Sequence, residues 1–240
     1  MPGDPSSGDG SRGPWIGRQT WRDLLFAHWA VDPGALRPLV PEGLEVDTWG
    51  GEAWVGVIPF RIEGLRVRGF PDLPTATDFL ELNVRTYVHR RGRPGVYFFS
   101  LDAASRLAVL GARRIFGLPY RHADMAQRAG ADGWIRYRCR RRDGRAAFDA
   151  RYRPAGDVFR AVEGTLEHFL VERYRLFVPT RPGVLRRVEV AHLPWPLRPA
   201  EARIDVNTMA AAAGVSLPDS APLLHFADRL DVRTGPPRTA

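Results

Sequence analysis

Residues 135–152 read Ile-Arg-Tyr-Arg-Cys-Arg-Arg-Arg-Asp-Gly-Arg-Ala-Ala-Phe-Asp-Ala-Arg-Tyr. The central pair, Asp143-Gly144, is typical of a two-residue hairpin loop of type I′. A loop of that length places Arg138 opposite Asp149 on one face of the hairpin and gathers apolar side chains on the other. This alternation is typical of an antiparallel sheet with one buried face.

Further hairpins are expected on the N-terminal side of this segment. Residues 44–49 and 52–60 flank Gly50-Gly51, a pair that tolerates the positive φ of a tight turn. Residues 81–89 alternate in polarity, and residues 96–101 return after a basic turn. One face of the strand at 81–89 carries Glu81, Asn83, Arg85 and Tyr87.

Three helices are predicted among these strands, over residues 103–116, over residues 166–177 and in an alanine-rich segment that begins near Asn207 and ends at Gly214. Asp102 and Thr165 are the expected N-caps of the first two. Short helices dispersed among antiparallel hairpins predict an α+β fold, mostly antiparallel β, with one dominant and closed sheet.

The length of 240 residues favours one domain, which we expect over residues 15–233. Residues 1–14 are rich in Gly, Pro and Ser and predict a disordered N-terminal arm, while residues 234–240 predict a frayed C-terminus. The single cysteine, Cys139, suits a reducing compartment. The sequence shows neither a signal peptide nor a membrane-spanning segment, so we expect a cytoplasmic protein with no membrane partner.

All 35 basic residues are arginine, since the chain contains no lysine. Schiff-base catalysis and phosphate binding by a P-loop both need a lysine, so both are excluded. The net charge is +8, and the densest group of arginines comprises Arg136, Arg138, Arg140, Arg141, Arg142 and Arg145. We interpret this group as a solvated sheet face, and a nucleic-acid partner is not expected.

The motifs of common catalytic and metal sites are missing from the sequence. It contains no Gly-x-Ser-x-Gly, His-Glu-x-x-His, dinucleotide-binding glycine fingerprint or Cys-x-x-Cys. The six histidines never lie two or four residues apart. We therefore expect no metal and no cofactor, although spacing alone leaves open a metal site assembled from distant histidines. The sequence also leaves open the roles of His28, His122, His192 and His225.

Several segments together resemble one bacterial family. They are Leu-Leu-Phe-Ala-His-Trp-Ala-Val at 24–31, Glu-Leu-Asn-Val-Arg-Thr-Tyr-Val at 81–88, Tyr-Phe-Phe-Ser-Leu-Asp-Ala at 97–103, Gly-Ala-Arg-Arg-Ile-Phe-Gly-Leu-Pro-Tyr at 111–120, His-Leu-Pro-Trp-Pro-Leu at 192–197 and Leu-Leu-His-Phe at 223–226. On these residues the chain is identified as a member of the YqjF-like family, a domain of unknown function (number 2071). The family carries no assigned activity.

A wider resemblance concerns Asp-Pro-Gly-Ala-Leu-Arg-Pro-Leu-Val-Pro-Glu-Gly-Leu-Glu-Val-Asp at 32–47, which is similar to the N-terminal segment of acetoacetate decarboxylases. The resemblance implies a double-layered β-cone or barrel that encloses a pocket. Those enzymes form an imine between a β-keto acid and the first of two adjacent lysines. Their lysine motif looks like residues 113–121, with Tyr120 at the imine position and Arg121 after it. Acetoacetate decarboxylase activity is therefore predicted to be absent.

The same resemblance implies a set of ligand-binding residues: Arg22, Glu81, Arg113, Tyr120 and Arg121. Arg22 matches the arginine that serves the substrate carboxylate, whereas the second pocket glutamate of the family falls near Gly56 and is lost. The arginines suit a carboxylate or another anion. Glu81 and Tyr120 are the candidate catalytic pair, as a base and a hydrogen-bond donor toward a carbonyl or enol.

Three functions remain open from the sequence. The one we favour is binding of a small organic anion, such as a keto or enol acid, in an arginine-rich pocket. The second is an enzyme that uses the same pocket for enolisation, lyase or hydrolase chemistry without an imine. The third is polyanion binding through the outer arginine face. The sequence leaves the ligand and a homo-oligomeric state undecided.

Overall fold

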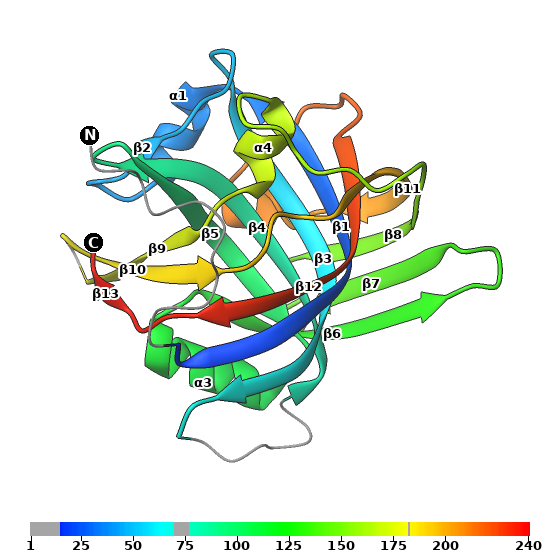
Figure 1. The fold of residues 1–240 in the computed structure, drawn as a ribbon, viewed down its shortest axis with the longest axis horizontal. Coiled ribbons are helices and arrows are strands. Elements are labelled where there is room, and N and C mark those ends of the chain that lie inside the picture. Colours follow the sequence, from blue (N-terminus) through cyan, green and yellow to red (C-terminus); the bar gives the residue numbers. More distant parts are fainter. Residues whose placement is uncertain (1–14, 70–76, 182) are drawn as a thin grey trace.

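The computed structural model describes residues 15–69, 77–181 and 183–240. The predicted disordered arm, residues 1–14, lies outside these described residues. Strands make up most of the fold (Figure 1). They are β1 (Gly17–Val31), β2 (Glu45–Val46), β3 (Ala53–Val67), β4 (Phe79–Arg90), β5 (Arg93–Ala103), β6 (Tyr120–Ala129), β7 (Ile135–Arg141), β8 (Ala147–Pro154), β9 (Arg175–Arg181), β10 (Val184–Ala191), β11 (Leu197–Asn207), β12 (Leu223–Thr234) and β13 (Arg238–Thr239).

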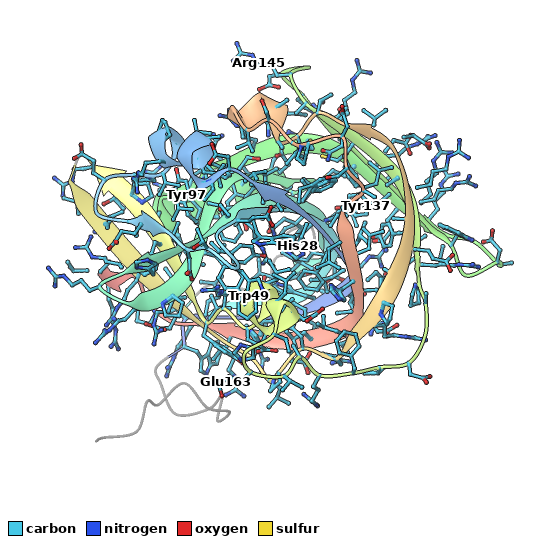
Figure 2. The ribbon with its side chains drawn as sticks, turned by 90° about the horizontal axis from the view of Figure 1, so that it is seen from above. His28, Trp49, Tyr97, Tyr137, Arg145 and Glu163 are labelled. Carbon is cyan, nitrogen blue, oxygen red and sulfur yellow. The ribbon has the colours of Figure 1, made fainter. Side chains whose placement is uncertain are left out.

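These strands follow the order β13-β10-β9-β5-β6-β7-β8-β11-β12-β1-β3-β4-β2. The pairs are antiparallel, except that β5 runs parallel to β6 and to β9. In addition, β4 pairs with β5. The strands from β5 through β6, β7, β8, β11, β12, β1 and β3 to β4 therefore form a closed ring. Seen from above, the strands surround a central region in which His28 lies (Figure 2). The prediction of an α+β fold that is mostly antiparallel β is confirmed.

The hairpin of β7 and β8 has the register that its two-residue loop implies. Arg138 lies opposite Asp149, and Cys139 lies opposite Phe148. The apolar face is fully buried at Tyr137. The register follows from local sequence because the loop length fixes which residues face one another.

The side chains of β1, β3 and β4 alternate between two cores. Leu24 and Phe26 of β1 belong to an inner core, whereas Leu25 and Ala27 belong to an outer core that they share with Tyr137 of β7. Since neighbouring residues of a strand point to opposite faces, one strand can serve both cores. The result is two layers, and the inner core surrounds the cavity described below.

The first predicted helix begins later than expected. Helix α3 spans Arg106–Phe116, and its N-cap is Ser105, whose side chain accepts a hydrogen bond from Ala108 N. Asp102, the expected cap, lies in β5 and forms a buried ion pair with Arg141. The expected end is confirmed, because Gly117 adopts the left-handed conformation with φ 71° that a helix C-terminus favours.

The second predicted helix is much shorter than expected. Thr165 is its N-cap as expected, but α4 spans only Leu166–Val171, and β9 follows from Arg175. The apolar spacing that suggested a helix through Phe177 is overridden by pairing of β9 with β5 and β10. This early end brings Arg173 and Arg175 to the cavity instead of placing them on a helix surface.

The remaining differences are local. The alanine-rich segment forms only the 3-10 turn Ala211–Ala213, which Gly214 ends with φ 82°. Residues 49–52 form the expected turn, but β2 pairs with β4 instead of with the strand that follows the turn. The predicted frayed end is wrong at residues 238–239, because β13 pairs with β10.

The other helical segments are also short. They are α1 (Pro33–Leu36) and the 3-10 turn Arg37–Leu39. Within the described part of the chain, no helix is long and apolar enough to cross a membrane.

Candidate functional site

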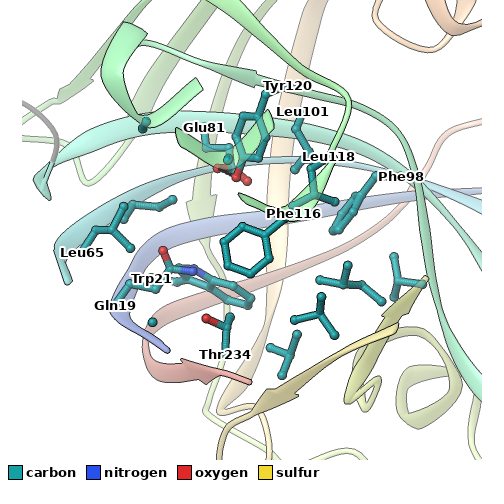
Figure 3. Close-up of a pocket in the computed structure, with 18 of the residues that line it drawn as sticks. Gln19, Trp21, Leu65, Glu81, Phe98, Leu101, Phe116, Leu118, Tyr120 and Thr234 are labelled. Carbon is teal, nitrogen blue, oxygen red and sulfur yellow. Dashed lines mark hydrogen bonds between the residues drawn. The ribbon is translucent and has the colours of Figure 1, made fainter. Parts of the chain in front are cut away.

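A cavity of about 290 Å³ lies within the inner core, bounded by strands from both ends of the chain and by α3 (Figure 3). Its walls are largely apolar and aromatic. They include Trp21, Phe79, Phe98, Phe116, Leu118 and Trp195. The volume is close to the lower end of the range that small-molecule sites occupy, about 300–1,000 Å³.

Glu81 and Tyr120 meet on the wall of this cavity (Figure 3). The Tyr120 hydroxyl donates a hydrogen bond of 2.7 Å to Glu81 Oε2. Glu81 is only 3% exposed, and no arginine forms an ion pair with its carboxyl within the described residues. The pair is therefore a hydrogen-bonded carboxyl and phenol in an apolar enclosure.

Burial changes the proton affinity of both groups. It raises the pKa of Glu81 from its ordinary 4.5 to about 8, partly opposed by the Tyr120 hydrogen bond and assisted by the charge of Asp102. Burial and the neighbouring Glu81 together hold the pKa of Tyr120 well above its usual value. Since a low-dielectric site disfavours charged forms, Glu81 holds its proton at neutral pH.

Main-chain and side-chain contacts fix both partners. Tyr120 is the first residue of β6, where it lies beside Leu101 of β5 in a parallel pairing. Arg113 Nε on α3 donates a hydrogen bond of 2.7 Å to the main-chain oxygen of Tyr120. On the opposite face of β4, the hydroxyl of buried Tyr137 donates to the main-chain oxygen of Glu81 at 2.8 Å. The pair is thus held by both layers of the fold.

The cavity is also lined by three arginines that sequence reasoning did not select: Arg85, Arg173 and Arg175. Arg173 pairs with Asp47 at 2.7 Å, and Arg175 lies 3.3 Å from Glu189. A signal for Arg85 was present, because the alternation of residues 81–89 assigns it to the same face as Glu81. Arg173 and Arg175 could not be found, because the predicted helix covered them.

The structure does not bring Arg22 to the cavity. Its side chain is 39% exposed and lies 3.6 Å from Glu63 on the outer surface. Before Asp23 the inward residue of β1 is Trp21, and after it the inward residues are Leu24 and Phe26. Asp23 has a φ of 55°, so the alternation shifts by one residue at this irregularity and turns Arg22 outward.

Arg113 and Arg121 also lie outside the cavity. Arg121 follows Tyr120 in β6, and its side chain is exposed because neighbours in a strand point to opposite faces. Arg113 is exposed on α3 and contacts the main chain of Tyr120 instead of the cavity. Of the five residues selected from the sequence, the structure therefore brings together Glu81 and Tyr120.

Gly56, which the resemblance aligns with the second pocket glutamate of acetoacetate decarboxylases, lies beside His28. A Cβ on Gly56 would be 3.0 Å from the His28 ring, so the missing side chain makes room for the imidazole. His28 is buried, and its Nε2 lies 2.6 Å from the Tyr87 hydroxyl. Burial holds the pKa of His28 well below its usual value, so the ring is neutral near pH 7.

The other histidines whose roles the sequence left open are scattered. His192 lines the cavity and stacks on Tyr174 with 4.6 Å between ring centroids. His225 packs edge-on against Phe159, while His122 lies in β6 beside Ala103. Across the described residues, no three His, Cys, Asp or Glu side chains are grouped so that they could hold a metal ion.

Comparison with known proteins places the chain in a family. The sequence profile of domain of unknown function 2071, described as "Uncharacterized conserved protein", matches residues 18–231. The chain is 50% identical over 226 residues to "Uncharacterized protein YqjF" of Bacillus subtilis (strain 168), and the match covers 94% of this chain and 93% of that protein.

Solved structures of similar fold are each about 15% identical in sequence to this chain. The enduracididine biosynthesis enzyme MppR with HEPES buffer bound has a TM-score of 0.71 at 15% identity, over 100% of this chain and 92% of that chain. MppR complexed with pyruvate has a TM-score of 0.69 at 15% identity, over 100% and 95%. Acetoacetate decarboxylase from Legionella pneumophila subsp. pneumophila str. Philadelphia 1 has a TM-score of 0.67 at 15% identity, over 100% and 92%. These likenesses confirm the acetoacetate decarboxylase-like fold.

Proposed function

The chain belongs to the uncharacterised family known as domain of unknown function 2071, and we propose that it binds a small organic anion in its inner cavity. One observation carries the proposal: a buried carboxyl, hydrogen-bonded to a phenol, lies on the wall of an apolar cavity that three arginines also line. Convergent polar groups in an otherwise apolar hollow are typical of ligand sites.

The chemistry of these groups favours a carbonyl-bearing acid. The Tyr120 hydroxyl has one proton and donates it to Glu81 in the structure. Either the protonated Glu81 donates a hydrogen bond to a carbonyl or enol oxygen of the ligand, or Glu81 donates to Tyr120 and the hydroxyl donates to the ligand. Guanidinium groups bind carboxylates in a bidentate manner. The complex of pyruvate with MppR, a protein of similar fold, supports a keto acid as the first ligand to test. Because the chain contains no lysine, no lysine side chain can form an imine with such an acid.

Pyruvate and acetoacetate are expected to bind saturably and to raise the melting temperature. Replacing Tyr120 by phenylalanine is expected to weaken binding about 2- to 12-fold, the range for one neutral hydrogen bond. Isothermal titration calorimetry measures the affinity. Tyr97→Phe is the matched control, because Tyr97 packs near the small core around Phe177 and does not line the cavity. No saturable binding of any small carboxylic acid, or equal losses in both variants, would contradict the proposal.

An enzyme acting on the same ligand is the second candidate, favoured by the hydrogen bond that Tyr120 donates to Glu81 on the cavity wall. In its ionised form the Glu81 carboxylate can take a proton from the carbon next to a carbonyl. The electrons of the broken C–H bond then form the enolate C=C bond, and the carbonyl oxygen gains the negative charge. Glu81 is now protonated, so the Tyr120 hydroxyl can turn from it and donate its hydrogen bond to that oxygen. This chemistry needs no imine.

Such an enzyme is expected to exchange the α-hydrogens of a bound keto acid with deuterium from D₂O. Proton NMR follows the loss of the α-hydrogen signal. Glu81→Gln is expected to stop the exchange while the acid still binds, because glutamine keeps the hydrogen-bonding shape but cannot accept the proton. If exchange does not exceed the buffer rate, the protein binds the acid without turning it over.

Polyanion binding through the outer arginine face is the least favoured function. Asp149 pairs with both Arg136 and Arg138, and Asp124 pairs with Arg142. Arg141 is not on this face at all, because it is buried against Asp102. Much of the positive charge counted from the sequence is therefore neutralised or enclosed.

A further inference from the structure

Arg85 differs from the other two arginines of the cavity. Among the residues that the structure describes, no carboxylate lies within ion-pair distance of Arg85, whereas Arg173 has Asp47 and Arg175 has Glu189. The Arg85 Nε is shielded from solvent and has no hydrogen-bond partner. A cation in an apolar enclosure is unfavourable unless a negative group accompanies it.

The surroundings of Arg85 do not supply that negative group. Its guanidinium carbon lies over the rings of Phe26 and Tyr87, at 5.6 and 5.7 Å from their centroids. These ring contacts orient the guanidinium but carry no net charge. The Arg85 side chain hydrogen-bonds to Tyr87, whose raised pKa keeps the phenol neutral. The other titratable groups that respond to its charge include His28, His192 and Arg173, which are neutral or positive. The site is thus built for an anion from outside the chain.

The position of Arg85 in β4 also determines how far the Arg85 side chain lies from Glu81 and Tyr120. Glu81 and Arg85 lie on the same inward face of β4, which pairs with β3 without a register shift between them. Four residues of extended strand separate their Cα atoms by about 13 Å. The Arg85 guanidinium lies over the ring of Tyr87, which is two residues farther from Glu81 along β4, so it is directed away from Glu81. A two-carbon or three-carbon acid, pyruvate included, can therefore contact one end of the cavity at a time, whereas a ligand that contacts both ends must be longer.

The side chains that line the rest of the cavity are mostly apolar. Phe98 and Leu101 of β5, together with Trp21, Leu176, Val190 and Trp195, line the cavity. None of these side chains offers a charge, and the pair Trp21 and Trp195 stacks with 5.8 Å between ring centroids. A ligand that fills the cavity must therefore carry an apolar body between its polar ends.

We propose that the ligand is a monocarboxylic acid with an extended apolar body, whose carboxylate binds Arg85 and whose body lies along β4 toward the Glu81–Tyr120 pair. The inference rests on the proposed function and narrows its ligand class. A linear acyl chain and an arylalkyl chain share this chemistry. The Glu81–Tyr120 end accepts a neutral polar group or the end of the chain.

The test is a homologous series of straight-chain acids, acetate, butanoate, hexanoate and octanoate, titrated against the whole protein. Tryptophan fluorescence reports binding, since Trp21 and Trp195 line the cavity. Affinity is expected to rise about fourfold for each added CH₂ group up to octanoate. Octan-1-ol, which has the same body without the charge, is expected to bind at least tenfold more weakly than octanoate.

Arg85→Met is expected to remove the preference for octanoate over octan-1-ol while octan-1-ol still binds. Its melting temperature without ligand is expected to equal or exceed that of the parent, because methionine replaces a partly buried cation that lacks an acid. Arg85→Gln, which is polar but uncharged, serves as the second variant. Arg138→Met, on the outer face, is the matched control and should leave every affinity unchanged.

The outcomes separate this inference from the proposed function. If pyruvate and acetoacetate bind but affinity does not rise with chain length, or if Arg85→Met keeps the preference for octanoate, the assignment of Arg85 is wrong and the proposed function stands. If no acid of either kind binds, the proposed function fails as well. A chain-length dependence that is equal for acids and alcohols shows an apolar site without an anion subsite and also overturns the assignment.

Discussion

Replacing Arg141 by methionine is expected to lower the free energy of unfolding by about 3–5 kcal/mol. Arg141 donates to both carboxylate oxygens of Asp102, at 2.7 and 2.8 Å. The side chains are 4% and 0% exposed. Loss of the guanidinium leaves a buried carboxylate without a counter-charge, and that uncompensated charge is the source of the penalty. Urea denaturation of the variant and the parent measures the difference.

Two controls identify the cause of this loss. The double variant with Asp102→Leu and Arg141→Met removes both charges, and most of the stability is expected to return because an apolar pair can replace a buried ion pair. Arg138→Met removes an arginine that is 56% exposed beside Asp149, and exposed ion pairs contribute little to stability. If the double variant is as unstable as Arg141→Met, packing and not charge determines the effect.

Replacing Glu81 by glutamine is expected to change how stability depends on pH. The pKa of Glu81 is about 8 in the folded chain and about 4.5 when exposed. Between these values the folded state holds a proton that the unfolded state has released, so rising pH favours unfolding. The parent is therefore expected to lose about 1.4 kcal/mol of stability per pH unit relative to the variant.

The window of this effect runs from about pH 5 to about pH 8, and the accumulated difference is about 4 kcal/mol. Below the window Glu81 is protonated in both states, and its contribution no longer changes with pH. Urea denaturation at pH 5, 6, 7 and 8 measures both proteins, and titrations of other groups cancel in the difference. A difference that stays constant across this range means that Glu81 ionises in the folded protein as it does in water.

Local rules predicted the parts of the fold that depend on neighbouring residues. The register of residues 135–152 follows from a two-residue loop, and Gly117 ends α3 because glycine adopts a positive φ without strain. Both features are decided within a few residues of chain. The segment after α4 is different, because β9 forms by pairing with distant β5 and β10.

In the site, too, some features could be predicted from the sequence and others depend on irregularities that appear only in the structure. The resemblance to acetoacetate decarboxylases placed Glu81 near Tyr120, which the structure brings within 2.7 Å. It also placed Arg22 in the pocket, because a match without gaps cannot show the shift of alternation at Asp23. Whether Glu81 and Tyr120 act on a ligand stays a prediction.

The alternation of side chains along a strand could have identified two inward-pointing arginines that the arginine-rich composition led us to assign to the surface or to overlook. Arg85 shares the inward face of β4 with Glu81, and Arg141 shares the buried face of β7 with Cys139. Counting Arg141 among a dense arginine cluster assigned it to solvent, although its position in the strand pointed inward. For both side chains, the position along the strand, which alternates between the two faces of the sheet, predicts burial better than the local density of arginine does.

A crystal structure of the protein grown with octanoate would decide whether the inner cavity is a binding site for an organic anion. We expect the carboxylate within hydrogen-bond distance of the Arg85 guanidinium, with the acyl chain along β4 between Trp21 and Phe98. A structure at saturating octanoate whose cavity contains only water, or whose octanoate lies on the outer surface, would contradict the proposed site.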